Sequence, residues 1–267
     1  RNTRILMEVL GYLGALAIGL VLGLTGGGGS MLTVPILTYI LLINPVTATA
    51  YSLFVVGTTS AFGAFQNAKN GWVDFKNGFL FAVPSFIAVY LTRRFIVPEI
   101  PEVLISKPFV LERGAFLMIF FGIIMLLAAF SMLKKKKNPA ENQKPTHINV
   151  LIIQTFFIGI VIGLVGAGGG FLIIPSLVLF AKLPMKKAIG TSLFIIAINS
   201  LIGFLGDVQN LTIDWFFLLV FTGLSIIGIF LGMYLSKFTN EAQLKKGFAY
   251  FVLAMALVIF YKEITAL

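Results

Sequence analysis

The chain has 267 residues, of which 58% are hydrophobic and 11% are charged. A soluble domain carries about 25% charged residues, and a disordered chain needs low hydrophobicity, so both classes are excluded. Strands of a transmembrane barrel alternate in polarity over about ten residues, whereas the apolar runs here are continuous. The composition therefore predicts an all-α polytopic membrane protein.

The formal net charge is +10, and the basic residues lie between the apolar runs. Cytoplasmic loops of membrane proteins collect Lys and Arg in this way, so the charge indicates topology and no nucleic-acid partner is expected. The chain has no cysteine, and its single histidine, His147, lies in a polar stretch. Disulfides and histidine–cysteine metal clusters are thus excluded, and we expect neither a metal nor a cofactor.

A bilayer core of about 30 Å needs about 20 apolar residues per spanning helix. Ten apolar segments are predicted, the first as a retained span and not a signal peptide. The second and seventh are too short to cross unaided. The ten segments are Ile5–Leu24, Met31–Ile43, Thr47–Phe65, Val73–Leu91, Gly114–Leu133, Val150–Val165, Phe171–Phe180, Ala188–Leu205, Ile213–Leu235 and Leu244–Tyr261.

The chain contains an internal repeat. The sequence GLVLGLTGGGGSMLTVP from Gly19 matches GIVIGLVGAGGGFLIIP from Gly159, and the alignment continues without a gap to Gly63 and Gly203. We call the constant spacing that separates Gly19 from Gly159 the repeat offset. Several glycines and one proline are identical at this offset, and shared apolar composition does not explain them. We therefore predict two transmembrane repeats, residues 1–133 and 150–267, joined by a basic linker over residues 134–149.

Charge decides between two topologies for these repeats. With five crossings per half the second half is inverted and 13 Lys and Arg lie on one side against 7 on the other, whereas four crossings give 10 on each side. The positive-inside rule therefore favours inverted halves, with the linker in the cytoplasm and both termini outside.

Inverted repeats with paired, glycine-broken segments are a pointer to a transporter's substrate site. Here the pair is GGGGS at Gly26–Ser30 and GAGGG at Gly166–Gly170. Non-helical backbone is tolerated in a bilayer only where it is buried or lines a cavity. The helix that follows each loop presents free N–H groups and a positive dipole end, which bind anions. The two loops thus predict an anion site near the bilayer midplane.

No Lys, Arg or His is expected in the middle of a span, so the anion would be bound by backbone N–H groups, hydroxyls and amides. The third and eighth segments carry such polar side chains at helical spacing. No catalytic residue is predicted. The candidate substrate-binding residues are Gly27, Gly28, Gly29, Ser30, Ser52, Thr59, Ser60, Gly168, Gly169, Gly170, Ser192, Asn199 and Ser200.

Several of these features also have purely structural interpretations. Glycines at four-residue spacing, such as Gly19 and Gly23, favour close helix packing, within the chain or in a homo-oligomer. Hydroxyls in a span can bond back to their own helix, which leaves their role open. Asp74 and Asp214 follow short polar turns and are expected to be helix N-caps.

The doubled motif and the polar turn KNGWVD at residues 69–74 resemble the TauE/SafE family of sulfite exporters, over essentially the whole chain. The resemblance implies movement of small sulfur-containing anions, such as sulfite or the organosulfonate sulfoacetate, across a bacterial or archaeal inner membrane. It also implies anion ligands in the backbones of Gly27–Ser30 and Gly168–Gly170. The chain departs from symmetry, since Gly27 matches Ala167, and the second polar turn, DVQNLTID, has no basic residue.

Alternating access with export is the predicted mechanism. Moving one negative charge outward gains about 2.3 kcal/mol per 100 mV of inside-negative potential, so an anion exporter needs no coupling ion. An anion channel on the same site and a membrane scaffold without flux remain as alternatives. An enzyme is not expected, because the chain lacks the P-loop, G-x-S-x-G and HExxH motifs.

Overall fold

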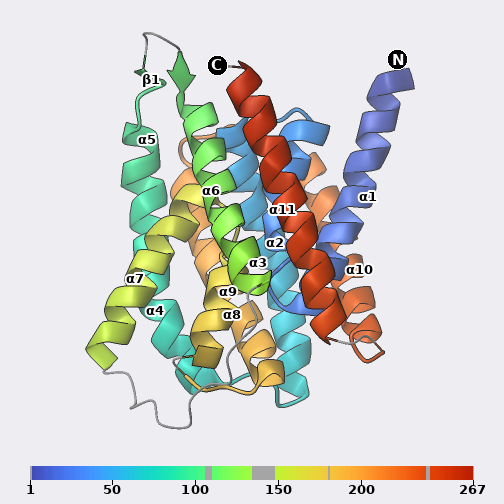
Figure 1. The fold of residues 1–267 in the computed structure, drawn as a ribbon, viewed down its shortest axis with the longest axis vertical. Helices are drawn as coiled ribbons and strands as arrows, with labels where there is room; N and C mark the ends of the chain where they lie inside the picture. The colour runs from blue at the N-terminus through green and yellow to red at the C-terminus, as the bar shows by residue number, and fades with distance from the viewer. Residues whose placement is uncertain (1, 106–109, 134–147, 180, 239–240, 267) are drawn as a thin grey trace.

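A computed structural model describes residues 2–105, 110–133, 148–179, 181–238 and 241–266. Most of these residues are helical, as expected for an all-α membrane protein (Figure 1). The linker predicted at residues 134–149 lies almost wholly outside the described residues. The first half contains α1 (Asn2–Thr25), α2 (Ser30–Pro35), the π-helix η1 (Ile36–Ile40), α3 (Pro45–Lys69), α4 (Phe75–Leu91), the π-helix η2 (Thr92–Ile96), α5 (Val97–Glu99) and α6 (Arg113–Leu133).

Between α5 and α6 of the first half, two short strands that the sequence did not predict, β1 (Val103–Ile105) and β2 (Leu111–Glu112), pair antiparallel.

The second half has the same order of long helices as the first. The helices of the second half are α7 (Ile148–Val165), α8 (Gly170–Leu179), α9 (Met185–Asp207), α10 (Trp215–Leu235) and α11 (Glu241–Ala266).

Each of the ten predicted apolar segments lies mainly in a helix, and the second lies across α2 and η1. The prediction was wrong at the end of the fourth segment, which was placed at Leu91. The helix instead continues through a π-helical turn at Thr92–Ile96 to Glu99. A π turn keeps a helix going with one extra residue and shifts the face on which later side chains lie. This extension carries Arg93 into the protein.

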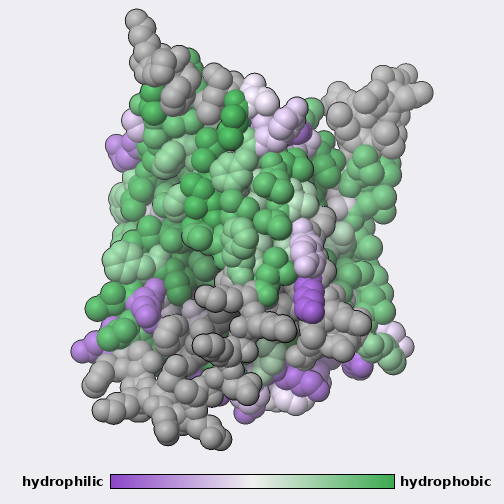
Figure 2. Space-filling view, in the orientation of Figure 1, coloured by the Kyte–Doolittle hydropathy of each residue, from purple (hydrophilic) through white to green (hydrophobic). Residues whose placement is uncertain are grey.

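Four helices are long and apolar enough to cross a membrane, judged by length and composition over the described residues. They are Pro45–Lys69, Phe75–Glu99, Met185–Asp207 and Trp215–Leu235. The visible face of the molecule has a broad apolar band in its middle, and the polar side chains gather toward the two ends (Figure 2). This distribution is the one that a bilayer-spanning protein needs, because its lipid-facing side chains must be apolar.

Helices of one half pack mainly on helices of the other half. Two of the largest contacts are those of α1 with α10 and of α4 with α7. These two pairs correspond to each other under the repeat offset. Two further large contacts, α3 with α9 and α6 with α11, each join a helix to its own counterpart, and α4 also packs on α9. The halves therefore exchange their first and fourth helices, and both contribute side chains to the same hydrophobic clusters.

Glycines permit the exchanged contacts. A methyl group at Gly19 of α1 would collide with the carbonyl of Ser225 in α10, and one at Gly159 of α7 would collide with the carbonyl of Ser85 in α4. Gly23 lies in the same way against α10. The packing interpretation of these glycines is confirmed: without a side chain, the helix backbones come into direct contact.

The central helices α3 and α9 run antiparallel. Gly57 lies against Ser200, while Gly190 near the start of α9 lies against Asn67 near the end of α3. Both chain termini lie at the top of Figure 1, and α7 begins at the lower left. We call the end where α1 begins and α11 ends the terminal end, and the end where α3 and α10 end and α9 begins the linker end.

Matching N-caps start the fourth helix of each half, as predicted. The carboxylate of Asp74 accepts from the N–H of Asn77 and that of Asp214 accepts from the N–H of Phe217, both at 3.0 Å. The N–H of Asp74 donates to the hydroxyl of Thr191 (2.9 Å), and that of Asp214 donates to the hydroxyl of Tyr51 (2.7 Å). The hydrogen bond from Asn77 lowers the pKa of Asp74 from its usual value.

Candidate functional site

Each half turns back on itself at a glycine-rich loop, between α1 and α2 and between α7 and α8. The first glycine of each loop has a left-handed backbone, with φ of +75° at Gly26 and +70° at Gly166, a conformation that glycine adopts without steric cost. Each of these glycines closes the preceding helix, because its N–H donates to the carbonyl of Leu22 (2.7 Å) or Ile162 (2.8 Å). The two loops therefore begin in the same way.

The two glycine loops touch each other. A Cβ atom on Gly27 would come within 2.7 Å of the Cα of Gly170, and a Cβ on Gly170 would meet the backbone of Gly27. Beyond this contact the loops differ, because Gly168 and Gly169 have positive φ whereas Gly29 has the φ of a right-handed helix. An anion between the loops, as the sequence predicts, would have to part the contact of Gly27 with Gly170.

Some of the hydrogen-bonding groups of the first glycine loop already have partners within the chain. The N–H of Gly28 donates to the hydroxyl of Thr25 (2.8 Å), and the hydroxyl of Ser30 donates to the carbonyl of Gly27 (2.7 Å). Such N–H groups at the start of a helix are the usual anion ligands. Within the described residues, four glycine N–H groups of the two loops have no hydrogen-bond acceptor, and they belong to Gly27, Gly29, Gly168 and Gly170.

The six predicted polar side chains of α3 and α9 are all buried. Two of them have partners: the hydroxyl of Ser192 donates to the carbonyl of Gly26 (2.8 Å), and Nδ2 of Asn199 donates to the hydroxyl of Ser85 in α4 (2.9 Å). Leaving a buried hydroxyl unpaired costs about 1–3 kcal/mol, so water or a ligand is expected beside each of the others. Among these six side chains, the hydroxyls of Ser52, Thr59, Ser60 and Ser200 have no hydrogen-bond partner in the described part of the chain.

Ser200 connects these hydroxyls to the second glycine loop. A Cβ on Gly168 would lie 3.1 Å from Oγ of Ser200 and 2.7 Å from the side chain of Val56 in α3. The first loop contacts α9 as well, through the bond from Ser192 to Gly26. The structure thus brings both glycine loops against the α3–α9 pair.

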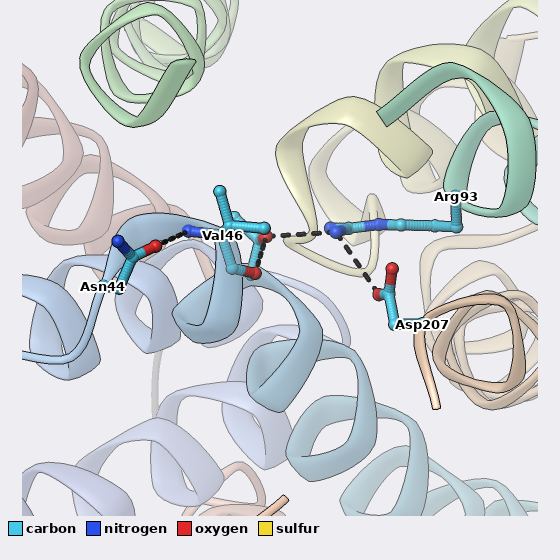
Figure 3. Close-up of polar contacts among 5 residues, drawn as sticks. Asn44, Val46, Arg93 and Asp207 are labelled. Carbon is cyan, nitrogen blue, oxygen red and sulfur yellow. Dashed lines mark hydrogen bonds and ion pairs between the residues drawn. The ribbon is translucent and has the colours of Figure 1, made fainter. Parts of the chain in front are cut away.

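Arg93 is a buried cation that the sequence analysis missed. Its side chain has no exposed surface. Nη1 donates to the hydroxyl of Thr49 in α3 (3.0 Å) and lies 3.3 Å from a carboxylate oxygen of Asp207 in α9 (Figure 3). A methyl group at Gly166 would collide with Nη2 of Arg93, so the guanidinium lies directly against the second glycine loop. The sequence analysis expected no basic residue in the middle of a span; Arg93 lies near the end of its helix and is nevertheless fully buried.

Two signals in the sequence pointed toward this ion pair. Arg93 follows a long apolar run, and the next proline, Pro98, comes only five residues after it. A helix could therefore continue past Arg93. Asp207 lies seven residues after Ser200, which places it on the same face of α9. A basic residue at the end of an apolar run usually lies at the membrane interface. For this reason the sequence analysis did not predict that Arg93 is buried.

A cavity of about 280 Å³ opens at the linker end. It is lined by two lysines, two asparagines and the end of α1, next to the first glycine loop. Its lining residues are Gly23, Leu24, Asn67, Asn70, Trp72, Lys186, Ile189, Met233, Ser236 and Lys237.

The cavity and the buried ion pair occupy equivalent places in the two halves. The repeat offset relates Asn67 to Asp207, and it also relates Arg93 to Met233. Ile189, which lines the cavity, corresponds in the same way to Thr49 at the ion pair. One end of the α3–α9 pair is therefore hollow and the other is filled.

The family model described as "Sulfite exporter TauE/SafE" matches residues 11–259. The chain belongs to the TauE/SafE family. This match spans both glycine loops, the α3–α9 pair and Arg93, so every feature of the candidate site lies in the TauE/SafE region.

Curated relatives of this TauE/SafE protein are named "Probable membrane transporter protein". One from Xylella fastidiosa (strain 9a5c) is 26% identical over 253 residues, covering 92% of both chains. YunE of Bacillus subtilis is 28% identical over 240 residues, covering 79% of this chain and 81% of its own. A relative from Methanocaldococcus jannaschii is 28% identical over 203 residues, covering 74% and 70%. No solved structure matches significantly. The TauE/SafE protein is thus a membrane transporter and not an enzyme.

Proposed function

We propose that this transporter exports small sulfur-containing anions, sulfite or an organosulfonate such as sulfoacetate, across the cytoplasmic membrane of a bacterium or archaeon. The observation that carries the proposal is the set of unpaired polar groups between the two halves. Four buried hydroxyls without a partner and four free glycine N–H groups lie on the described elements that meet at the glycine loops. A small oxyanion offers several acceptor oxygens, and such donors are what it needs when it leaves water.

The proposed mechanism is alternating access by two inverted repeats. Three features support it. The helices α3 and α9 run antiparallel, and α1 and α4 are exchanged between the halves in a matched way. One end of the α3–α9 pair has a cavity, whereas the other is filled by the ion pair. Rocking one half against the other would open the filled end and close the hollow one, as in other inverted-repeat carriers. The anion would pass the contact between Gly27 and Gly170.

The proposal is tested by efflux from liposomes that contain the purified protein and sulfite. We expect efflux that rises with an imposed inside-negative potential, that saturates, and that sulfoacetate inhibits. Counterflow, in which unlabelled sulfite outside accelerates labelled efflux, is expected from a carrier and would be absent from a channel. Absence of any flux, with and without a proton gradient, would refute sulfur-anion transport and favour the scaffold.

The site is tested by removing hydroxyls in matched pairs. Ser200→Ala removes an unpaired buried hydroxyl beside Gly168, and we expect the half-saturating sulfite concentration to rise about tenfold, the effect of roughly one hydrogen bond to a charged group. Ser176→Ala is the control, because the hydroxyl of Ser176 already donates to the carbonyl of Leu172 in its own helix (2.8 Å). Equal effects of both substitutions would contradict the proposed site.

A further inference from the structure

Arg93 has fewer partners than a buried guanidinium requires. An arginine has five N–H donors, and here a single hydrogen bond to Thr49 is formed, at Nη1. The contact with Asp207 at 3.3 Å is an ion pair without hydrogen-bond geometry. Within the described residues, Nε and Nη2 have no acceptor. A buried cation is stable only when good hydrogen bonds satisfy its remaining donors, so acceptors are missing from this site.

The free edge of the guanidinium faces the second glycine loop. Nη2 lies against Gly166, whose added methyl group would also come within 2.7 Å of the carbonyl oxygen of Thr49. The hydroxyl of Thr92, next to Arg93 in the chain, is buried and unpaired as well. The free donors of Arg93 thus lie next to the loop that carries the free N–H groups of Gly168 and Gly170, and the side chain of Thr92 packs against Gly163 in the helix before that loop.

The fold itself does not require an ion pair in this place. The equivalent positions in the other half hold Met233 and Asn67, which are both uncharged, and the same helices pack there. Replacing a buried ion pair by uncharged side chains of similar size is commonly neutral for stability. A function other than stability therefore accounts better for Arg93 and Asp207.

We propose that Arg93 binds the transported anion, and that the carboxylate of Asp207 takes the place of that anion in the present state. The inference rests on the proposed function. A carboxylate and a sulfite or sulfonate group both offer oxygen atoms to the flat fork of a guanidinium. An arriving oxyanion would accept from Nε and Nη2, and Asp207 would move away. When the anion leaves, Asp207 returns and keeps the guanidinium paired.

Two variants separate this proposal from a structural role of the ion pair. The double variant R93M/D207N gives this end the Met and Asn that the other half carries at the equivalent positions. Asp207→Asn alone keeps the guanidinium and removes the competing negative charge. Arg94→Met is the control, because it removes a neighbouring charge that lies outside the site. The measurements are the half-saturating sulfite concentration for efflux and the melting temperature with and without sulfite.

We expect R93M/D207N to fold, with a melting temperature close to that of the wild type, and to need at least about tenfold more sulfite, the effect of one lost charge-assisted hydrogen bond. Asp207→Asn is expected to lower the half-saturating concentration about tenfold and to gain more thermal stability from sulfite than the wild type does. Arg94→Met is expected to leave the half-saturating concentration unchanged.

Wild-type transport and affinity in R93M/D207N would overturn the proposal, because the ion pair would then be structural. If R93M/D207N does not fold, Asp207→Asn decides alone: an unchanged or raised half-saturating concentration would also overturn the proposal. Absence of sulfite and sulfoacetate flux in the wild type is a different result, since it refutes the proposed function on which this inference rests.

Discussion

The two ends of the α3–α9 pair use equivalent backbone positions and fill them differently. At the linker end, Asn67 and Met233 border a cavity of about 280 Å³. At the terminal end, Asp207 and Arg93 occupy the corresponding positions and are almost wholly buried. The two ends thus differ in the side chains at equivalent positions, and Asn67 with Met233 against Asp207 with Arg93 is the part of this difference that involves the ion pair. The open and the closed end therefore differ in side chains, while the helices that form them correspond.

The strongest test of this comparison is to make the two ends alike. The variant N67D/M233R places an acid and a guanidinium where the cavity now lies, so we expect the linker end to close. Sulfite efflux should fall about tenfold or more, since each tenfold change in rate corresponds to only about 1.4 kcal/mol. Met233→Leu, which keeps an uncharged side chain of similar size, is the control. Wild-type efflux in N67D/M233R would show that the cavity is not on the path.

A weaker effect is expected from the lysines of the cavity. Lys186→Gln and Lys237→Gln each remove a charge that attracts anions to the linker end, and we expect the half-saturating concentration to rise about fivefold at low salt. At 1 M salt, where screening acts within about 3 Å, the difference should disappear. Lys262→Gln changes a lysine of α11 at the terminal end and serves as the control for net charge. An effect that persists at high salt would indicate direct coordination and not attraction.

The smallest effect is expected at the two equivalent N-caps. Asp74→Ala and Asp214→Ala each remove a carboxylate that accepts from a helix N–H, which costs about 1 kcal/mol of unfolding free energy. The pKa of Asp74 is lower in the folded state than in the unfolded chain. Its contribution is therefore complete above the unfolded pKa of about 4 and is lost as the pH falls through the folded pKa. Melting temperatures measured from pH 7 down to pH 3 should show Asp74→Ala approaching the wild type, and a constant difference would contradict this assignment.

Much of the fold follows from patterns that depend on local sequence. Continuous apolar runs predict helices whatever their partners, and all ten were found. The paired glycines predict two loops with unusual backbone, because positive φ at Gly26 and Gly166 is a local property. Asp74 and Asp214 are caps for the same reason.

The rest depends on contacts between distant segments. The exchange of α1 and α4 between the halves is set by the surface of whole helices and not by any motif. Arg93 is buried because a π turn lengthens its helix and because Thr49 and Asp207 reach it from two other helices. Asn199 looked equally free in the sequence, and its bond to Ser85 depends on how α4 packs against α9.

The exchange of helices between the halves has a consequence for biosynthesis. When the ribosome has completed the first half, α1 has been made but its main packing partner, α10, begins only at Trp215. The surface of α1 at Gly19 and Gly23, which contacts the backbone of α10 in the complete protein, therefore lacks this partner until the second half has been synthesised. The nascent first half must wait in the bilayer without its final neighbours. A chain cut in the linker should regain its native form only when both fragments are made in the same membrane.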